Sequence, residues 1–300
     1  MENQLSAAPA CYRHPKKETY VRCTRCDRYI CPDCMRDAAV GHQCVECVRE
    51  SNKTVRQART VFGGKVSAVP VVTYVLIALN VLAYSGELLW PAIVDRFDSL
   101  GLGLMDTDGQ YYLFESGTGL EPVGVASGEW YRLITSAFLH LPVMDGGFWI
   151  LHIVFNMYWL WTLGRVVEEV LGKLRFIALY LLSAFGGSVM GYLISPDQAA
   201  VGASGAIFGL AAAYFFFSRR LNHDPVGATR LIVMFLIWMV VSAGISSWEG
   251  HLGGLLVGSV VALGLNHLPR RLHFTAAGAM FLFLVILVVL KTSQLTGVIA

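Results

Sequence analysis

The sequence predicts an all-α, polytopic membrane protein preceded by a small metal-binding module. Of its 300 residues, 55% are hydrophobic and 15% are charged, with a mean hydropathy of +0.55, whereas charged residues make up about a quarter of an average soluble domain. Seven apolar runs, each about long enough to cross a bilayer, follow one another after residue 68. All seven cysteines lie within the first 47 residues. An ordinary soluble domain is therefore excluded.

The N-terminal cysteines and one histidine form four pairs, each with two intervening residues. Each pair can present two soft ligands to one tetrahedral ion, so eight ligands suit two structural Zn²⁺ sites and leave no position for a catalytic water. Cysteines gathered in this way fit a metal module in a reducing compartment better than a disulfide scaffold. His42 is an alternative ligand, although the fourth pair makes it unnecessary. The candidate ligands are Cys11, His14, Cys23, Cys26, Cys31, Cys34, Cys44 and Cys47.

The spacing of these pairs resembles that of the B-box and related cross-braced zinc modules. This resemblance implies that alternate pairs share a metal, the first with the third and the second with the fourth. It leaves the partner of the module unknown. The arginines of the module could suggest nucleic acid, but only one aromatic residue, Tyr29, lies between Arg22 and Arg36. We therefore expect a solvated or lipid-headgroup-facing surface and no nucleic acid.

Lysine and arginine are unevenly distributed along the chain. Residues 1–67 carry twelve of them against seven Asp and Glu, whereas residues 86–145 carry nine acids and only two arginines. Basic connections favour the cytoplasm, so we expect an integral, multi-pass protein of a bacterial cell membrane, with its N-terminus inside and its C-terminus outside. The expected membrane helices are 69–85, 147–164, 174–194, 202–218, 230–246, 250–267 and 274–291.

Four segments follow from this organisation. We expect a zinc module at 1–50, a linker or juxtamembrane segment at 51–67, a core of six transmembrane helices at 68–268, and an additional transmembrane helix with a tail at 269–300. The connection at 86–146 is too long for a plain linker, and its aromatic residues favour a position partly in the membrane interface. Long loops of this kind tend to carry or gate function.

One serine stands between glycines at the start of an apolar run. Gly202 and Gly205 let another backbone come close to Ser204, and the first turn of the following helix leaves unpaired N–H groups beside its hydroxyl. These are the parts of a nucleophile with an oxyanion site. Small residues in membrane helices also serve close helix packing, so the serine alone does not decide between the two readings.

Three further polar residues are expected at the outer ends of other helices, at about the depth of Ser204. Such side chains are costly in a bilayer and usually face a cavity or a partner. His251 can accept the Ser204 proton, and His152 and Asn156, at i and i+4 on one helix face, can both donate to a developing oxyanion. No intramembrane carboxylate is placed to orient His251, so we expect a dyad. The alternative third members, at helix ends, are Asp197 and Glu249.

Glycines recur every four residues on the two helices that would carry the dyad. They are Gly250, Gly254 and Gly258 on one helix, and Gly205 and Gly209 on the other. Such faces permit the close backbone approach that a serine–histidine contact between two helices needs.

With these residues in place, the chain resembles the rhomboid intramembrane serine proteases over residues 69–267. The resemblance implies a six-helix rhomboid core, here with a seventh helix added, and a serine-type endopeptidase that cleaves transmembrane protein substrates near the outer face without a cofactor. Its expected partners are those substrates and membrane lipids. The matching motifs are Gly202-Ala203-Ser204-Gly205, Gly250-His251-x-x-Gly254, His152-x-x-x-Asn156, Trp130-Tyr131-Arg132 and Gly164-Arg165-x-x-Glu168.

Four features qualify the resemblance. Phe208 stands where some members have a tyrosine that stacks on the base, so we expect ring packing against His251 without the hydroxyl. The segment 141–148 is longer than usual. His140 matches a residue that is structural in the family, and Arg132 is better explained as an anchor of the outer loop than as a catalytic group.

A second function remains open beside the protease. A catalytically silent relative could bind membrane clients and escort or retain them. Such a protein could lose Ser204 or His251 freely, and both are present here. A small-solute transporter is disfavoured because its ionisable groups would lie near the bilayer midplane rather than near one surface. The identity of the substrates and the oligomeric state are open.

Overall fold

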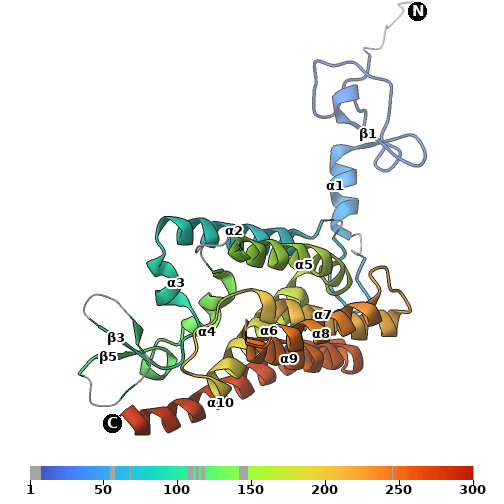
Figure 1. Ribbon diagram of the computed structural model, residues 1–300. Helices are drawn as coiled ribbons and strands as arrows, with labels where there is room; N and C mark the ends of the chain where they lie inside the picture. The colour runs from blue at the N-terminus through green and yellow to red at the C-terminus, as the bar shows by residue number, and fades with distance from the viewer. Residues whose placement is uncertain are drawn as a thin grey trace, which may run out of the picture. The chain divides into compact units, whose positions relative to one another are not determined.

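The computed structural model describes residues 8–54, 58–67, 69–106, 111–112, 115, 119–141, 148–244 and 246–299 (Figure 1). The chain divides into two compact units, Met1–Ala58 and Arg59–Ala300. The first is a small cysteine-rich unit, and the second holds all of the predicted membrane helices.

The cysteine-rich unit has little regular structure. A 3₁₀ turn, η1 (Pro32–Cys34), leads into an antiparallel hairpin of β1 (Met35–Asp37) and β2 (His42–Cys44), and α1 (Val45–Thr54) follows. Its buried cluster consists of Ile30 and six of the seven cysteines, with Cys26 packed against it. A core with so few large apolar side chains cannot stabilise forty residues by itself. We therefore expect bound metal ions to supply the folding free energy of this unit.

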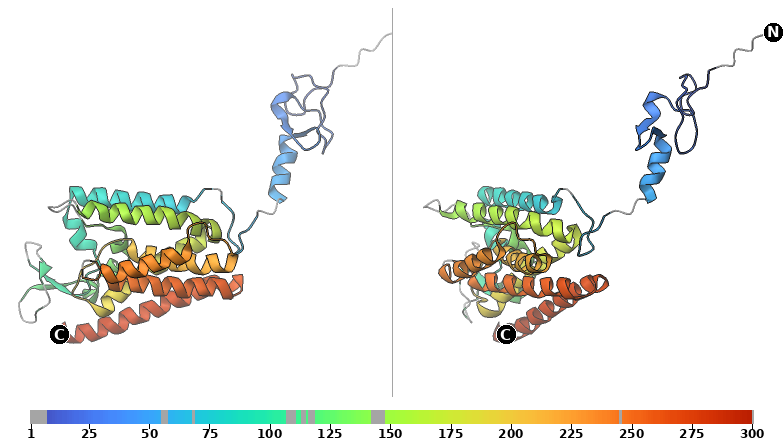
Figure 2. Two further views of the ribbon diagram at one scale, coloured as in Figure 1. Left: turned by 45° about the vertical axis from the view of Figure 1, so that its right-hand side comes forward. Right: turned by 90° about the vertical axis from the view of Figure 1, so that its right-hand side faces the viewer.

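In the described part of the second unit, seven helices of 14 residues or more form a bundle, one for each predicted span. Figure 2 shows α2 and α5 side by side at one edge and α10 at the opposite edge, with α7 and α9 between them. The observed ends lie within eight residues of the predicted ones, and the predicted ends at Ile194 and His267 coincide with the observed ones. The helices are α2 (Val71–Leu89), α5 (Phe148–Leu171), α6 (Lys173–Ile194), α7 (Ser204–Leu221), α8 (Ala228–Val241), α9 (Trp248–His267) and α10 (His273–Ile299).

Within the described residues, five segments are long and apolar enough to cross a membrane: α2, α6, α9, Ile150–Leu171 within α5, and Arg270–Thr296, which includes most of α10. Helix α8 is a shorter apolar helix. Helix α7 packs against α5, α6, α8 and α9, and most of its residues are buried. Its many small residues suit this central position, because they allow four neighbours to approach the same helix.

Glycines bring α7 and α9 together, as their spacing predicts. A Cβ atom at Gly254 would overlap the carbonyl oxygen of Gly205, and one at Gly258 would overlap the Cα of Gly209. A Cβ at Gly205 would lie 3.1 Å from the carbonyl oxygen of Gly250. The two backbones are therefore in direct contact along this face.

The long connection between α2 and α5, which we call the outer connection after its expected side of the membrane, is folded over much of its described length. A three-stranded antiparallel sheet, in the order β4-β3-β5, is flanked by short helical segments. The predicted longer segment at 141–148 falls mostly outside the described residues, which omit 142–147. The elements are α3 (Ala92–Phe97), β3 (Gly103–Met105), β4 (Tyr111–Tyr112), β5 (Glu121–Val123), η2 (Val125–Ser127), α4 (Arg132–Thr135) and η3 (Ser136–Phe138).

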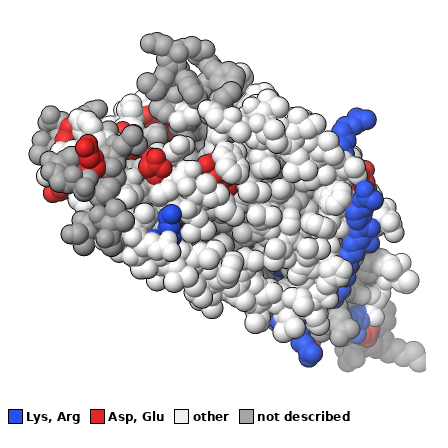
Figure 3. Space-filling model, turned by 60° about the horizontal axis from the view of Figure 1, so that its bottom comes forward, with Lys and Arg blue, Asp and Glu red and all other residues white. Residues whose placement is uncertain are grey.

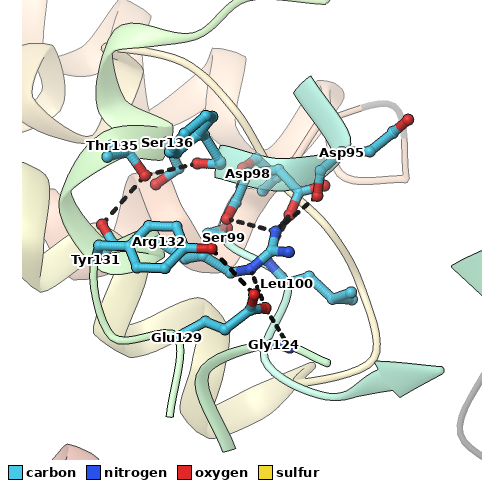
Figure 4. A network of polar contacts seen from close by, with 12 residues as sticks. Asp95, Asp98, Ser99, Leu100, Gly124, Glu129, Tyr131, Arg132, Thr135 and Ser136 are labelled. Carbon is cyan, nitrogen blue, oxygen red and sulfur yellow. Dashed lines mark hydrogen bonds and ion pairs between the residues drawn. The ribbon is translucent and has the colours of Figure 1, made fainter. Parts of the chain in front are cut away.

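Arg132 bonds to several segments of this connection, as expected for an anchor (Figure 4). Its side chain is 1% exposed. Its Nε donates to Glu129 Oε2 at 2.8 Å, and its Nη1 donates at 2.7 Å both to Asp98 Oδ1 and to the carbonyl oxygen of Asp95. Glu129 Oε2 also accepts from the Gly124 N–H at 2.7 Å. Because a buried charge must be fully partnered, this network fixes the loop against the α3 segment.

Glu168 joins the two helices at the edge of the bundle. Its Oε1 accepts from the Val72 N–H at 3.0 Å, and its Oε2 accepts from the Thr73 N–H and hydroxyl, both at 2.8 Å. A carboxylate at a helix N-terminus satisfies unpaired amides and complements the helix dipole. The last residue of the Gly164-Arg165-x-x-Glu168 motif thus caps α2 from α5.

Candidate active site

Ser204 is the first residue of α7, and a glycine prepares its position. Gly202 has φ of +129°, which side-chain-bearing residues rarely adopt, and its N–H donates to the carbonyl oxygen of Ser136 at 2.9 Å. A Cβ at Gly202 would lie 3.0 Å from His152 Nε2 and 3.7 Å from Ser204 Oγ. Glycine is needed here for its conformation and for the space that the His152 ring occupies.

Ser204 and His251 meet across the α7–α9 contact. The distance from Ser204 Oγ to His251 Nε2 is 3.0 Å, and the His251 side chain is buried. His251 Nδ1 is buried and has no hydrogen-bond partner among the described residues. A neutral imidazole with its proton on Nδ1 would present the Nε2 lone pair to the serine hydroxyl, which is the arrangement of a general base.

The surroundings of His251 fit a dyad and the expected ring packing. The Phe208 ring stacks on the imidazole with a centroid distance of 4.3 Å and an interplanar angle of 10°. Glu249, one alternative third member, accepts a hydrogen bond from the Ser195 hydroxyl at 2.8 Å. Asp197, the other, is exposed. Neither carboxylate is hydrogen-bonded to the imidazole.

The two oxyanion candidates lie on α5. His152 faces the glycine that precedes the nucleophile, as the Gly202 contact shows. Asn156 is buried, and its Nδ2 donates to the carbonyl oxygen of His152 at 2.8 Å. A primary amide has a second N–H, which remains for another acceptor. The first-turn amides of α7, beginning at Ser204, add donors without intrahelical partners.

A small polar cavity opens beside the nucleophile. Its volume is about 40 Å³, enough for a water molecule, and its lining includes Ser204, Gly202 and Gly250. Ser136 and Ser188 also line it, with their Oγ atoms 3.3 Å apart. The sequence analysis missed these two serines. Ser188 could have been noticed as a hydroxyl in the outer half of an apolar run, whereas Ser136 lies in a three-residue 3₁₀ turn that is too short to show a period.

Glu87 is a third residue that the sequence did not point to. The first helix was expected to end at residue 85, which left Glu87 in the loop, but α2 continues to Leu89 and Glu87 is fully buried. Both carboxylate oxygens accept from the His140 N–H at 3.1 Å. The His140 ring lies 5.2 Å from the His152 ring, centroid to centroid. This contact supports a structural role for His140 behind the oxyanion residue.

The eight predicted metal ligands gather in two groups of four. One group is Cys11, His14, Cys31 and Cys34, and the other is Cys23, Cys26, Cys44 and Cys47, with the ligand atoms of each group within 4.8 Å of one another. This is the cross-braced pairing that the resemblance to B-box modules implies. His42 belongs to neither group, and its Nδ1 lies 3.2 Å from Asp37 Oδ1.

The spacing within each group fits a tetrahedral zinc ion. Two thiolates bound at about 2.3 Å to such an ion lie about 3.8 Å apart, and the Sγ atoms of Cys26 and Cys44 are 3.8 Å apart. His14 Nδ1 lies 3.2 Å from Cys31 Sγ and 3.4 Å from Cys34 Sγ. The residues present therefore suit zinc.

The surroundings favour the thiolate form, which zinc binds, at Cys11 and Cys23, whereas burial raises the pKa of Cys34 to about 11 and that of Cys47 to about 12. Burial alone would raise the pKa of Cys11, but hydrogen bonds from backbone N–H groups of Cys31, Arg13 and His14 outweigh it and lower the pKa to about 6. Burial likewise opposes a similar set of backbone hydrogen bonds at Cys23, and the pKa is again lowered to about 6.

Comparison with known proteins defines the class. Residues 127–267 match the family model described as Rhomboid domain. The chain is 36% identical over 146 residues to the putative rhomboid protease YdcA of Bacillus subtilis, a match that covers 47% of this chain and 69% of YdcA. The chain therefore belongs to the rhomboid family, as its motifs predicted.

Two further relatives show how far the likeness extends. Rhomboid protease GluP of Bacillus subtilis is 35% identical over 151 residues, which cover 49% of this chain but only 28% of GluP. Rhomboid protease AarA of Providencia stuartii is 25% identical over 230 residues, or 67% of this chain and 74% of AarA. The Rhomboid match contains Ser204, His251, His152 and Asn156, whereas the cysteine-rich unit lies outside it.

Proposed function

We propose that this protein is an intramembrane serine endopeptidase with a Ser204–His251 dyad. The observation that carries the proposal is the 3.0 Å contact between Ser204 Oγ and His251 Nε2, made by two helices whose glycine faces touch. Two residues 47 positions apart meet in the geometry that nucleophilic catalysis needs. The relatives named as rhomboid proteases support the same activity.

The reaction would proceed in two stages. Ser204 Oγ attacks the peptide carbonyl carbon while His251 Nε2 takes the hydroxyl proton, and the C–N bond then breaks as His251 gives that proton to the leaving amine. His251 Nε2 then takes a proton from a water molecule, whose oxygen attacks the acyl carbon; the ester C–Oγ bond breaks and His251 returns the proton to Ser204 Oγ. The cavity beside Ser204 has room for this water.

The developing oxyanion would be held by three kinds of donor. His152 contributes an imidazole N–H, Asn156 the amide hydrogen not used by the His152 carbonyl, and Ser204 its own backbone N–H at the start of α7. Donors fixed before the reaction stabilise the charge without reorganisation, and each contributes strongly in a site that excludes bulk water.

We place the site near the outer face of the membrane, with transmembrane segments of other proteins as substrates. The support is electrostatic. On the face that Figure 3 shows, most of the visible Lys and Arg side chains lie towards one end and most of the visible acidic side chains towards the other. Basic ends of membrane proteins favour the cytoplasm, and the active site lies on the same side as the acidic outer connection, because Ser136 of that connection lines its cavity.

An escort without catalytic activity is the alternative function. Cleavage of a transmembrane substrate reconstituted with the purified full chain separates the two. The parent should cleave it, Ser204→Ala should not, and Ser259→Ala should behave as the parent, because Ser259 only donates to the Leu255 carbonyl within α9. An intact substrate after incubation with a folded parent that still binds it would favour the escort.

The cysteine-rich unit is proposed to hold two structural Zn²⁺ ions that take no part in the chemistry. Four protein ligands complete each tetrahedral site, so no coordination position is left to activate water. The unit would then recruit or regulate, and would not catalyse.

A further inference from the structure

Three arginines from separate segments converge on one turn at the basic end of the membrane unit. Arg59 Nη1 donates to the carbonyl oxygen of Gly63 at 3.1 Å, and Arg270 donates to the carbonyl oxygen of Val61 through Nε at 3.1 Å and Nη2 at 2.8 Å. A Cβ at Gly63 would lie 3.5 Å from Arg175 Nη2 and 2.9 Å from Arg270 Cδ. We call Arg59, Arg175 and Arg270 the arginine cluster.

The positive charge of this cluster is not balanced by the protein. Among the described residues, none of the three arginines forms a salt bridge. The strongest charged neighbours of Arg175 are the other two arginines. Like charges held close together repel, and an anion bound between them would relieve that repulsion. Each guanidinium has five N–H donors, so all three keep donors free for such an anion.

Arg175 also borders an apolar groove between α9 and α10. The groove has a volume of about 170 Å³, and Val260, Gly264, Leu268 and Phe274 contribute to its lining. Gly264 leaves room in this groove because it has no side chain. An added Cβ would have only one heavy atom within 4 Å, Leu268 Cδ1 at 3.8 Å, so the space around it is open. Most of α10 beyond this point is not covered by protein. The groove therefore opens on the surface that faces lipid.

His273 holds Arg175 at the junction between groove and cluster. Arg175 Nε donates to His273 Nδ1 at 3.1 Å, and His273 Nε2 lies 3.1 Å from the Leu268 carbonyl oxygen. The imidazole must be neutral to accept at one nitrogen and donate at the other. The guanidinium is thus oriented by a buried ring, with its two terminal nitrogens left for other partners.

We propose that this junction is a binding site for an anionic glycerophospholipid. The phosphate would bind the arginine cluster, and part of one acyl chain would occupy the α9–α10 groove. Charge complementarity selects an anionic headgroup, and the adjoining apolar groove selects a lipid over a free anion. A bound lipid would bridge α6, α9 and α10, and would stabilise the packing of α10 on the core by mass action. The proposal does not depend on the chemistry of Ser204.

The proposal is tested by measuring, with native mass spectrometry, how much lipid the purified full chain retains. The detergent-solubilised protein is titrated with phosphatidylglycerol or phosphatidylcholine of the same acyl chains. We expect phosphatidylglycerol to be retained preferentially. Arg175→Gln and Arg270→Gln should each weaken its retention roughly fivefold, because each removes one cation beside the phosphate. Arg271→Gln, an exposed neighbour outside the cluster, is the matched control and should leave retention unchanged.

A second variant and a competition experiment separate lipid from free anion. Gly264→Leu fills the groove without changing any charge, and we expect it to lose phosphatidylglycerol even if Arg175→Gln fails to fold. Inorganic phosphate at millimolar concentration should not displace the lipid. Equal retention of the two lipids, displacement by inorganic phosphate, or full retention by Gly264→Leu would each overturn the proposal.

Discussion

At the residue scale, the two proposed oxyanion donors on α5 make different contacts. His152 faces Gly202 beside the nucleophile, whereas Asn156 already gives one amide hydrogen to the His152 carbonyl. We expect His152→Ala and Asn156→Ala each to retain residual cleavage, because the other donors remain, with losses in kcat of up to roughly 10²–10³-fold.

Rates with a reconstituted transmembrane substrate check this prediction, beside thermal unfolding of each variant. His267→Ala, at the far end of α9 from the active site, is the control and should cleave like the parent. Unchanged kcat in both folded α5 variants would remove His152 and Asn156 from the site.

Some individual residues could be read from the sequence and others could not. Ser204 and His251 were selected as candidates because strongly polar groups are rare in apolar runs. The order of the helices also predicted that both residues lie at about the same depth in the membrane. The Phe208 ring packs on His251 as expected. Glu87 was missed because the first helix was expected to end at residue 85, although Pro91 follows the true end of α2 at Leu89, and Ser136 because a three-residue 3₁₀ turn is too short to show a period.

At the element scale, the glycine contact between α7 and α9 sets the distance between nucleophile and base. Gly254→Ala places a Cβ where the Gly205 carbonyl oxygen stands. Overpacking of this kind typically costs about 1–3 kcal/mol, and the helices must separate to relieve it. We expect a lower melting temperature in detergent together with a loss of cleavage.

Gly278→Ala on α10 is the matched control. A Cβ at Gly278 would have no heavy atom within 4 Å, so stability and cleavage should be those of the parent. If Gly254→Ala were as stable and as active as Gly278→Ala, the glycine contact between α7 and α9 would not set the distance between Ser204 and His251.

Helices were predictable as elements because each apolar run is continuous and bounded by charged or turn residues. Their ends were less so: α5 continues seven residues past the predicted 164, to Leu171, and carries Glu168 as the cap of α2. The small sheet of the outer connection was not predicted. Strands of two or three residues are too short to show alternation, and they depend on tertiary contacts such as the Arg132 network.

At the scale of the whole molecule, the first prediction concerns the cysteine-rich unit. The full chain should contain two Zn²⁺, one for each group of four ligands. Cys23→Ser combined with Cys26→Ser should lose zinc and unfold this unit, since metal binding supplies its folding free energy. Cleavage of a substrate in detergent should persist, because no zinc ligand lies in the Rhomboid match.

Metal analysis and limited proteolysis check both parts. His42→Gln is the control, because His42 lies outside both ligand groups and the zinc content should not change. One zinc or none in the parent would contradict the cross-braced assignment, and loss of cleavage on chelation would give the unit a catalytic role.

The second whole-molecule prediction concerns orientation. In intact cells, a membrane-impermeant maleimide should label Glu121→Cys, in the outer connection, but neither the parent nor Asn222→Cys, in the basic connection after α7. All native cysteines lie in the N-terminal unit, which is expected inside. Labelling of Asn222→Cys, and not of Glu121→Cys, would reverse the proposed topology and place the active site at the inner face.

The central claim is that Ser204 is a nucleophile activated by His251. Reaction of the purified full chain with a fluorophosphonate, followed by mass spectrometry of the modified peptide, tests it most directly. The account predicts one adduct on Ser204 in the parent, none in Ser204→Ala, and strongly reduced labelling in His251→Ala, because the hydroxyl loses the base that stands 3.0 Å away. A folded parent that takes up no label, or labelling that is undiminished in His251→Ala, would contradict it.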